Sequence, residues 1–157
     1  VHLGESRFAD RVLLKLATFG IERSRVEIRG WTTDGDPFAD YGMIDIALDT
    51  FPYTGATTTV ESLHMGVPVV SLKGDRYASR MSASILHAIG RDEWVADSVE
   101  EYIEVAVKLA ADLEGLAEIR SGLRGSVASS TLCDGAASAK SLQDALDFLW
   151  EQARTSR

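Results

Sequence analysis

The chain has 157 residues and a formal net charge of −8, with 24 acidic and 16 basic side chains, and 45% of its residues are hydrophobic. That length and apolar fraction are sufficient for one compact domain with its own core. The acidic balance excludes the basic footprint of a nucleic-acid-binding protein, so we expect no nucleic acid among the partners.

Further counts narrow the class of protein. No apolar run approaches the roughly 20 residues that span a bilayer, and no signal-peptide pattern opens the sequence, so we expect no membrane association. The single cysteine, Cys133, excludes an internal disulfide framework and favours a cytoplasmic location. We expect its thiol to be buried or incidental. His2, His64 and His87 are scattered and form no metal-ligand cluster with it, so no metal is expected.

The first 41 residues predict a helix, a strand and a short helix. Apolar residues recur at helical spacing over residues 6–19, and Gly20 follows where a C-terminal glycine belongs. Residues 25–29 alternate polar and apolar side chains, which predicts a strand. Residues 30–37 carry the Gly, Asp and Pro typical of a loop, and residues 38–41 predict a short helix.

The central stretch, residues 43–71, predicts a strand, a loop, a helix and a second strand. Residues 44–49 are apolar and rich in β-branched side chains, which is typical of a strand buried on both faces of a parallel sheet. Residues 50–56 contain the Pro and Gly of a loop. Residues 57–65 predict a helix that ends at a glycine, and residues 67–71 predict the second buried strand.

The loop and helix start of this stretch form a pattern that suits phosphate. The first amides of a helix lack internal partners and carry the positive end of its dipole. Thr57 and Thr58 would add hydroxyl donors to those amides, and Gly55 would let the backbone approach a ligand closely. Glu61, one turn later, could accept hydrogen bonds from ribose hydroxyls. The alternative is an ordinary threonine cap and a solvated glutamate.

The rest of the sequence continues the alternation of helices and strands. The expected elements are a helix over 76–89, a strand over 93–96, and helices that begin at a capping box at Ser98, at Leu113 and at Ala136. The whole pattern predicts an α/β fold, a Rossmann-like doubly wound parallel sheet with helices on both faces that closes with helices. We expect one domain over residues 1–157.

Three separated motifs resemble the O-linked N-acetylglucosamine transferases, glycosyltransferase family 41. The first is Leu48-Asp49-Thr50-Phe51-Pro52-Tyr53, followed by the glycine and threonines already described. The second runs from Glu61 to Val70 and includes Gly66-Val67-Pro68-Val69, and the third is Gly74-Asp75-Arg76-Tyr77-Ala78-Ser79-Arg80. They occur in the order and spacing of that family, and the resemblance extends from about Phe8 to Trp150.

This resemblance implies the C-terminal, nucleotide-sugar-binding half of a GT-B glycosyltransferase. It implies a UDP-sugar donor, with UDP-N-acetylglucosamine as the expected one, and transfer of the sugar to a protein side chain without a metal or other cofactor. The chain would contribute no catalytic residue and would be inactive alone, because the N-terminal half that binds the acceptor protein is missing. The residues implied are Thr32 for the base, Tyr53 near the sugar, Gly55, the Ala56 amide, Thr57 and Thr58 for the diphosphate, and Glu61 for the ribose.

Several positions depart from the pattern of that family. No lysine lies near Gly4, where a phosphate-binding lysine is expected, and Pro37 occupies the position of a nucleotide-binding histidine. Asp34 and Asp40 replace basic residues, which is unfavourable beside a diphosphate. Ala56 replaces a further histidine. None of the three histidines in the chain has the surroundings of a general base.

Two alternatives therefore remain open. One is a non-catalytic GT-B-like module that kept the fold with a degenerate nucleotide site and uses its surface for protein contacts. The other is a stand-alone sugar-nucleotide hydrolase or epimerase, which the lack of a base or a metal-binding carboxylate cluster disfavours. The apolar stripe of the last helix would brace another domain or pair with a second copy in a homodimer. We expect His64 to pack against the sheet and Arg80 to bond loop carbonyls.

Overall fold

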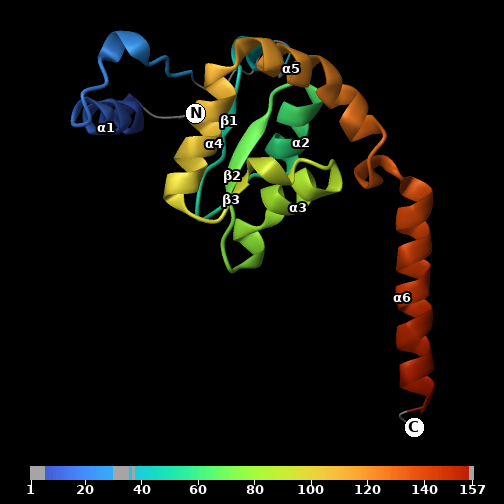
Figure 1. Ribbon diagram of the computed structural model, residues 1–157. Coiled ribbons are helices and arrows are strands. Elements are labelled where there is room, and N and C mark those ends of the chain that lie inside the picture. The colour runs from blue at the N-terminus through green and yellow to red at the C-terminus, as the bar shows by residue number, and fades with distance from the viewer. Residues whose placement is uncertain (1–5, 30–35, 37, 156–157) are drawn as a thin grey trace. The chain divides into compact units, whose positions relative to one another are not determined.

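The computed structural model describes residues 6–29, 36 and 38–155. Two compact units divide the chain, Val1–Ala39 and Asp40–Arg157, and the sheet lies in the second (Figure 1). The expectation of a single domain stays a prediction. None of the helices in the described part of the chain combines the length and apolar character needed to cross a membrane.

The first unit contains one regular helix, α1 (Ser6–Ala17). The chain leaves this helix through Gly20, whose φ of +76° is the left-handed conformation that the predicted glycine end requires. The predicted strand over 25–29 is wrong, because a 3₁₀ turn, η1 (Arg23–Arg25), is followed by extended residues with a single bridge position at Arg29. Local alternation cannot supply the neighbouring strand that a ladder requires.

The second unit is built on a three-stranded parallel sheet with the order β1-β2-β3. These strands are β1 (Ala47–Leu48), β2 (Val69–Leu72) and β3 (Val95–Ala96), and they fall inside or beside the predicted strands. Ala47 pairs with Val69 in the register of β1 on β2, and Ser71 pairs with Val95 in that of β2 on β3. The prediction of a parallel sheet is confirmed.

Along the chain, α2 lies between β1 and β2, α3 lies between β2 and β3, and α4 to α6 follow β3 (Figure 1). Their bounds are α2 (Thr57–His64), α3 (Met81–Ala88), α4 (Val99–Ala111), α5 (Leu113–Ala128) and α6 (Gly135–Thr155). The 3₁₀ turn η2 (Ala39–Met43) precedes β1, and three further turns lie between the helices: η3 (Tyr77–Ser79), η4 (Asp92–Trp94) and η5 (Thr131–Cys133). Each predicted helix of this part of the chain is therefore present within a few residues of its expected bounds.

Helices cover both faces of the sheet, as Figure 1 shows for α4 on one side and α2 and α3 on the other. Val69 of β2 points into a core with Leu63 of α2, Leu86 of α3 and Leu123 of α5. The next residue, Val70, points the opposite way and packs with Ala96 and with Tyr102 of α4. Because side chains alternate along a strand, one short central strand serves both cores. The doubly covered α/β fold is confirmed.

The turn that ends α2 fixes the path from the helix into β2. Gly66 has a φ of +78°, its N–H donates to the carbonyl of Leu63 at 3.1 Å, and the N–H of Val67 donates to the carbonyl of Ser62 at 2.8 Å. This pair of bonds is a Schellman motif. A Cβ on Gly66 would lie 2.9 Å from the backbone carbonyl oxygen of Arg120 in α5, so the helices also need the glycine for their close approach.

The last helix carries the apolar stripe that its sequence predicts, but none of its residues is buried. The side chains of Leu142, Leu146, Leu149 and Trp150 are each between 57% and 66% exposed. This stripe differs from that of α5, where Leu116, Leu123 and Val127 are buried. Whether another domain or a second copy covers α6 stays a prediction.

One expectation about a single side chain is wrong. His64 is exposed rather than packed against the sheet, because the helical period of α2 turns Thr59, Ser62 and Leu63 inward and leaves position 64 outside. Cys133 is also exposed, so of the two alternatives for its thiol, buried or incidental, only the incidental one remains.

Candidate functional site

The predicted loop after β1 lies at the carboxyl end of that strand, and the carboxylate of Asp49 holds the loop in place. Asp49 Oδ1 accepts a hydrogen bond from the Gly55 N–H at 2.8 Å, and Asp49 Oδ2 accepts one from the Ser71 hydroxyl at 2.8 Å. The Tyr102 hydroxyl donates to the Asp49 carbonyl at 2.9 Å. Three separate elements thus converge on Asp49, two of them through charge-assisted bonds to its carboxylate, and these contacts fix the position of the loop relative to the sheet.

The glycine of the loop has no room for a side chain. A Cβ on Gly55 would meet the hydroxyl oxygens of Thr59 and Thr58, the latter at 2.9 Å, and would lie 3.4 Å from Asp49 Oδ1. The Gly55 carbonyl accepts a hydrogen bond from the Ser82 hydroxyl at 2.9 Å. The close backbone approach that the sequence predicts at Gly55 is therefore present, but it serves the packing of the loop onto α2 and α3.

Buried hydroxyls join the start of α2 to the start of α3. Thr59 Oγ1 lies 2.8 Å from Ser82 Oγ, and Thr54 donates from its N–H and its hydroxyl to the Ala78 carbonyl at 2.9 and 3.0 Å. Thr54, Thr59 and Ser82 are all buried. No local sequence pattern predicts this network, because its bonded partners are more than 20 positions apart.

The first turn of α2 has backbone amides without an acceptor among the described residues. Ala56 is the N-cap residue and provides no side-chain cap, since alanine has no hydrogen-bonding group. In the part of the chain that the structure describes, no group accepts a hydrogen bond from the N–H of Ala56, Thr57 or Thr58. The alternative of an ordinary threonine cap is therefore not what is observed, and the N-terminus of α2 remains open to an acceptor.

The predicted diphosphate and ribose residues share one side of α2. Thr57 and Thr58 are exposed, Glu61 is half-buried, and the inward side is formed by Thr59, Ser62 and Leu63. Residues three and four apart lie next to one another on a helix surface, so the two threonines and the glutamate form one continuous strip.

The Glu61 carboxylate has a partner that the sequence did not reveal. The Tyr41 hydroxyl, from η2, donates to Glu61 Oε2 at 3.1 Å. Burial, followed by the hydrogen bond and the charge of Glu61, raises the pKa of Tyr41 above its ordinary value. The phenol therefore stays protonated at neutral pH and acts as a donor. The alternative of a merely solvated glutamate is not observed.

The remaining predicted residues have different outcomes. Thr32 lies outside the described residues, as do Asp34 and Pro37. Tyr53 has a side chain 70% exposed, and its carbonyl accepts a hydrogen bond from the Thr50 hydroxyl at 2.7 Å. Arg80 donates from Nε to the Gly74 carbonyl at 2.7 Å, as expected of a residue that bonds loop carbonyls.

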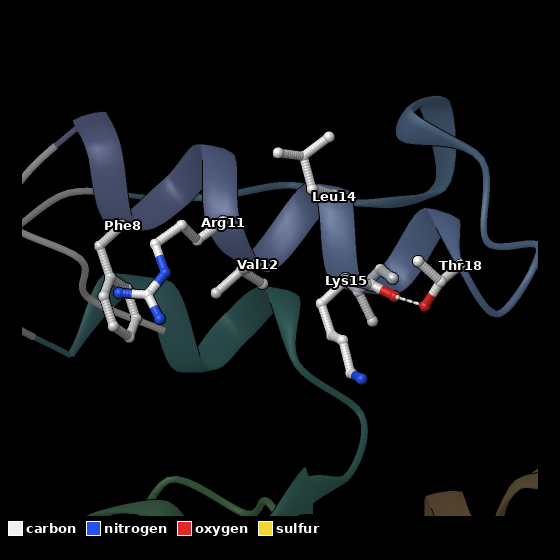
Figure 2. A pocket seen from close by; sticks show the side chains of 7 residues that line it. Phe8, Arg11, Val12, Leu14, Lys15 and Thr18 are labelled. Atoms are coloured by element: carbon white, nitrogen blue, oxygen red, sulfur yellow. Dashed lines mark hydrogen bonds between the residues drawn. The ribbon is translucent and has the colours of Figure 1, made fainter.

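A separate hollow lies along α1 in the first unit (Figure 2). Figure 2 shows that Phe8, Val12 and Leu14 line it together with Lys15 and Thr18, whose hydroxyl donates to the Lys15 carbonyl at 2.7 Å. It contains none of the residues predicted to bind nucleotide. Among the described residues, no group of three or more His, Cys, Asp and Glu side chains is placed to hold a metal ion.

Comparison with known proteins decides the family. The profile of glycosyl transferase family 41 matches residues 9–142 of this chain. The chain belongs to this family. It is 41% identical over 143 residues to a rice protein named probable UDP-N-acetylglucosamine–peptide N-acetylglucosaminyltransferase SPINDLY, and that match covers 90% of this chain and 15% of the rice protein. The Arabidopsis thaliana protein of the same name is 38% identical over 90% of this chain and 16% of its own length.

A solved structure of the family resembles the fold. The mutant O-GlcNAc transferase of Thermobaculum terrenum matches with a TM-score of 0.88 and 37% sequence identity, over 98% of this chain and 30% of that one. A relative from Caenorhabditis elegans, named UDP-N-acetylglucosamine–peptide N-acetylglucosaminyltransferase, is 31% identical over 85% of this chain and 12% of its own length. This family-41 chain therefore spans less than one third of the relatives that it matches.

Proposed function

We propose that this family-41 chain binds the nucleotide part of a UDP-sugar as the C-terminal half of a GT-B protein O-glycosyltransferase. The observation that carries the proposal is the start of α2, where the amides of Ala56, Thr57 and Thr58 have no acceptor among the described residues. The hydroxyls of Thr57 and Thr58 flank these amides, and Glu61 lies one turn further along the same side. The amides and hydroxyls suit a diphosphate, and the carboxylate beyond them suits the hydroxyls of the adjoining ribose.

The proposed roles follow from the chemistry of each group. The helix amides and the threonine hydroxyls hold the diphosphate, whose negative charge increases as the bond to the sugar breaks. Glu61 accepts hydrogen bonds from the ribose, and Gly55 and Ala56 bring the backbone close to the phosphates. Tyr53, exposed on the loop, lies near the sugar. The role of Thr32 at the base remains part of the proposal, outside the described residues.

The donor that we propose is UDP-N-acetylglucosamine, because the matched relatives carry that donor in their names. Transfer to an acceptor protein would occur in the cytoplasm and without a metal. The candidate site contains hydrogen-bond donors for the leaving diphosphate, and its carboxylates are already engaged, Asp49 with Gly55 and Ser71 and Glu61 with Tyr41. We therefore propose that the chain alone does not transfer sugar and needs the acceptor-binding half.

One observation favours the rival function, a protein-interaction module with a degenerate nucleotide site. The 21-residue helix α6 presents an apolar stripe that is exposed along its length. Asp40, which replaces a basic residue of the family pattern, adds negative charge to the second unit. The rival function requires no nucleotide affinity, so nucleotide binding separates the two functions.

Titration of UDP into the purified 157-residue chain by calorimetry tests the proposal. We expect a Kd between about 10 μM and 1 mM, which corresponds to roughly 4 to 7 kcal/mol of binding free energy. Thr57→Ala and Glu61→Ala should each weaken binding by about five- to tenfold, because each removes a hydrogen bond to a charged or polar ligand group. Glu100→Ala, at an exposed glutamate in the first turn of α4, is the matched control.

The outcomes separate the two functions. Binding that is weakened by both site variants and unchanged by Glu100→Ala supports the donor site. No detectable heat at millimolar UDP contradicts it and favours the interaction module. Equal affinities for all four proteins would mean that UDP binds at a different place on the chain.

A further inference from the structure

The hydrogen bond between Tyr41 and Glu61 joins two segments that are 20 residues apart in sequence. Tyr41 lies on η2, before β1, and Glu61 lies on the second turn of α2, after β1. The Tyr41 hydroxyl donates to Glu61 Oε2 at 3.1 Å, in a partly buried contact. The core residue Leu63, two positions beyond Glu61, is completely buried, so the α2 backbone that carries the glutamate is itself held in place.

This contact engages one carboxylate oxygen of Glu61 and leaves the other available to a ligand. Oε2 accepts from the phenol, whereas no other donor to the Glu61 carboxylate is present among the described residues. A glutamate side chain on an exposed helix surface normally samples several rotamers, and ordering it on binding a ligand costs conformational entropy. A partner with a rigid ring, held by partial burial, removes part of that freedom before the ligand arrives.

A carboxylate held in this way suits a particular class of ligand group. Neutral donors such as hydroxyls can bond Oε1 while the charge of the carboxylate is retained, and the vicinal hydroxyls of a ribose present such donors side by side. The strip on α2 places Glu61 one turn from the threonines proposed for the diphosphate. That separation lets a nucleoside diphosphate reach both.

We propose that Tyr41 is a positioning residue that sets the preference of the site for ribonucleotides over deoxyribonucleotides, by holding Glu61 ready for the ribose hydroxyls. This inference rests on the proposed function, because it assumes that UDP binds along α2. Tyr41 does not touch the nucleotide in this scheme and acts only through the glutamate.

The protonation of Tyr41 is consistent with this role. Burial raises the pKa of its hydroxyl above the ordinary value of a tyrosine, and the hydrogen bond to Glu61 and the Glu61 charge act in the same direction, whereas a hydrogen bond with Ser62 acts in the opposite one. At neutral pH the phenol is therefore protonated and donates to the carboxylate.

The test compares two nucleotides on one set of proteins. UDP and 2′,3′-dideoxy-UDP are titrated into the parent chain and into the Tyr41→Phe, Glu61→Gln and Tyr77→Phe variants. Tyr77 is 82% exposed on η3, so Tyr77→Phe is a control that removes the same hydroxyl away from Glu61. Thermal unfolding of each variant confirms that it is folded.

We expect the parent chain to bind UDP about tenfold more tightly than the dideoxy nucleotide, since the hydroxyls bond a charged acceptor. Tyr41→Phe should reduce this ratio to about threefold or less by weakening UDP, while the Kd of the dideoxy nucleotide stays within about twofold. Tyr77→Phe should keep the parent ratio, and Glu61→Gln should lose most of it. A structural role alone would weaken both nucleotides equally.

The outcomes that would overturn the inference are distinct. If the parent discriminates, Glu61→Gln loses the discrimination and Tyr41→Phe retains it, the role of Tyr41 is wrong and the donor site stands. If Tyr41→Phe weakens both nucleotides alike, Tyr41 supports the fold and does not position Glu61. If the parent binds UDP without discriminating, the ribose role of Glu61 fails and the inference fails with it. If the parent binds neither nucleotide, the proposed function itself is overturned, together with this inference.

Discussion

Helices α2 and α6 are both amphipathic in sequence, yet they end in opposite environments. The eight residues of α2 include three that are buried, Thr59, Ser62 and Leu63, and two of these are polar and hydrogen-bonded. The 21 residues of α6 include none that is buried, although its stripe is richer in large apolar side chains. An apolar stripe therefore predicts that a helix forms, whereas its burial depends on the partner that packs against it.

The contrast also explains why the candidate site lies on α2. The inward side of this helix is fixed by the core and by Ser82, so the exposed side presents its amides, hydroxyls and carboxylate in a defined arrangement. Groups held before the ligand arrives bind it with a smaller entropic loss. The apolar stripe of α6 offers area for a partner but few polar groups that are fixed in the same way.

The largest expected effect compares equivalent truncations in a buried and an exposed stripe. Leu123→Ala in α5 should lower the free energy of unfolding by about 3 kcal/mol, because it empties a completely buried position. Leu146→Ala in α6 should change it by less than about 0.5 kcal/mol, because Leu146 is 57% exposed. Urea unfolding measures both values. Similar losses for the two variants would show that α6 packs against a partner in solution.

A smaller effect is expected from one methyl group at the start of α2. Gly55→Ala should weaken UDP binding by about tenfold and lower stability by about 1–3 kcal/mol, since the new Cβ meets Thr58, Thr59 and Asp49. Gly122→Ala in α5 is the matched control, because a Cβ there would point into open space and alanine favours a helix. Calorimetry and urea unfolding measure the two quantities. Unchanged UDP affinity in Gly55→Ala would separate the loop from the binding site.

The smallest effect concerns alkaline pH and the contact of α4 with the site loop. Burial first, and the charge of Asp49 second, raise the pKa of Tyr102 to about 12. The unfolded chain therefore releases this proton first, so the stabilising contribution is complete below pH 10 and is lost as the pH rises towards 12. Between pH 10 and 12, the free energy of unfolding of the parent should therefore fall more steeply than that of Tyr102→Phe. The difference between the two slopes should be up to about 1 kcal/mol per pH unit.

The same pH series contains its own control. Tyr77→Phe removes a phenol that is 82% exposed, so its pH dependence should match that of the parent chain. If the free energies of unfolding of the parent and of Tyr102→Phe show the same pH dependence between pH 10 and 12, folding does not raise the pKa of Tyr102. That result would contradict the prediction.

Much of the fold was predictable because its signals are local. The β-branched runs around Ala47 and Val69 predicted the strands, and Gly20 and Gly66 predicted the ends of two helices, since each needs only its own neighbours. The strand over 25–29 failed because a strand requires a partner that the local pattern does not contain.

The candidate site was predictable only in part. Gly55, Thr57, Thr58 and Glu61 follow from a short pattern along one loop and one helix. The bonds from Ser82 to the Gly55 carbonyl and from Tyr41 to Glu61 connect residues 27 and 20 positions apart, so they depend on how the elements pack. The prediction for His64 failed because the apolar neighbours of this histidine favour burial, whereas the helical period of α2 places position 64 on the outside.

Two-dimensional amide NMR of the chain during a UDP titration tests the central claim most directly. We expect the amide signals of Ala56, Thr57 and Thr58 to shift most and to saturate with a single Kd, because these N–H groups have no acceptor among the described residues and receive the diphosphate. A signal near Glu61 should shift with the same Kd. Shifts concentrated on α1 or α6, or no shifts at millimolar UDP, would contradict a donor site at the start of α2.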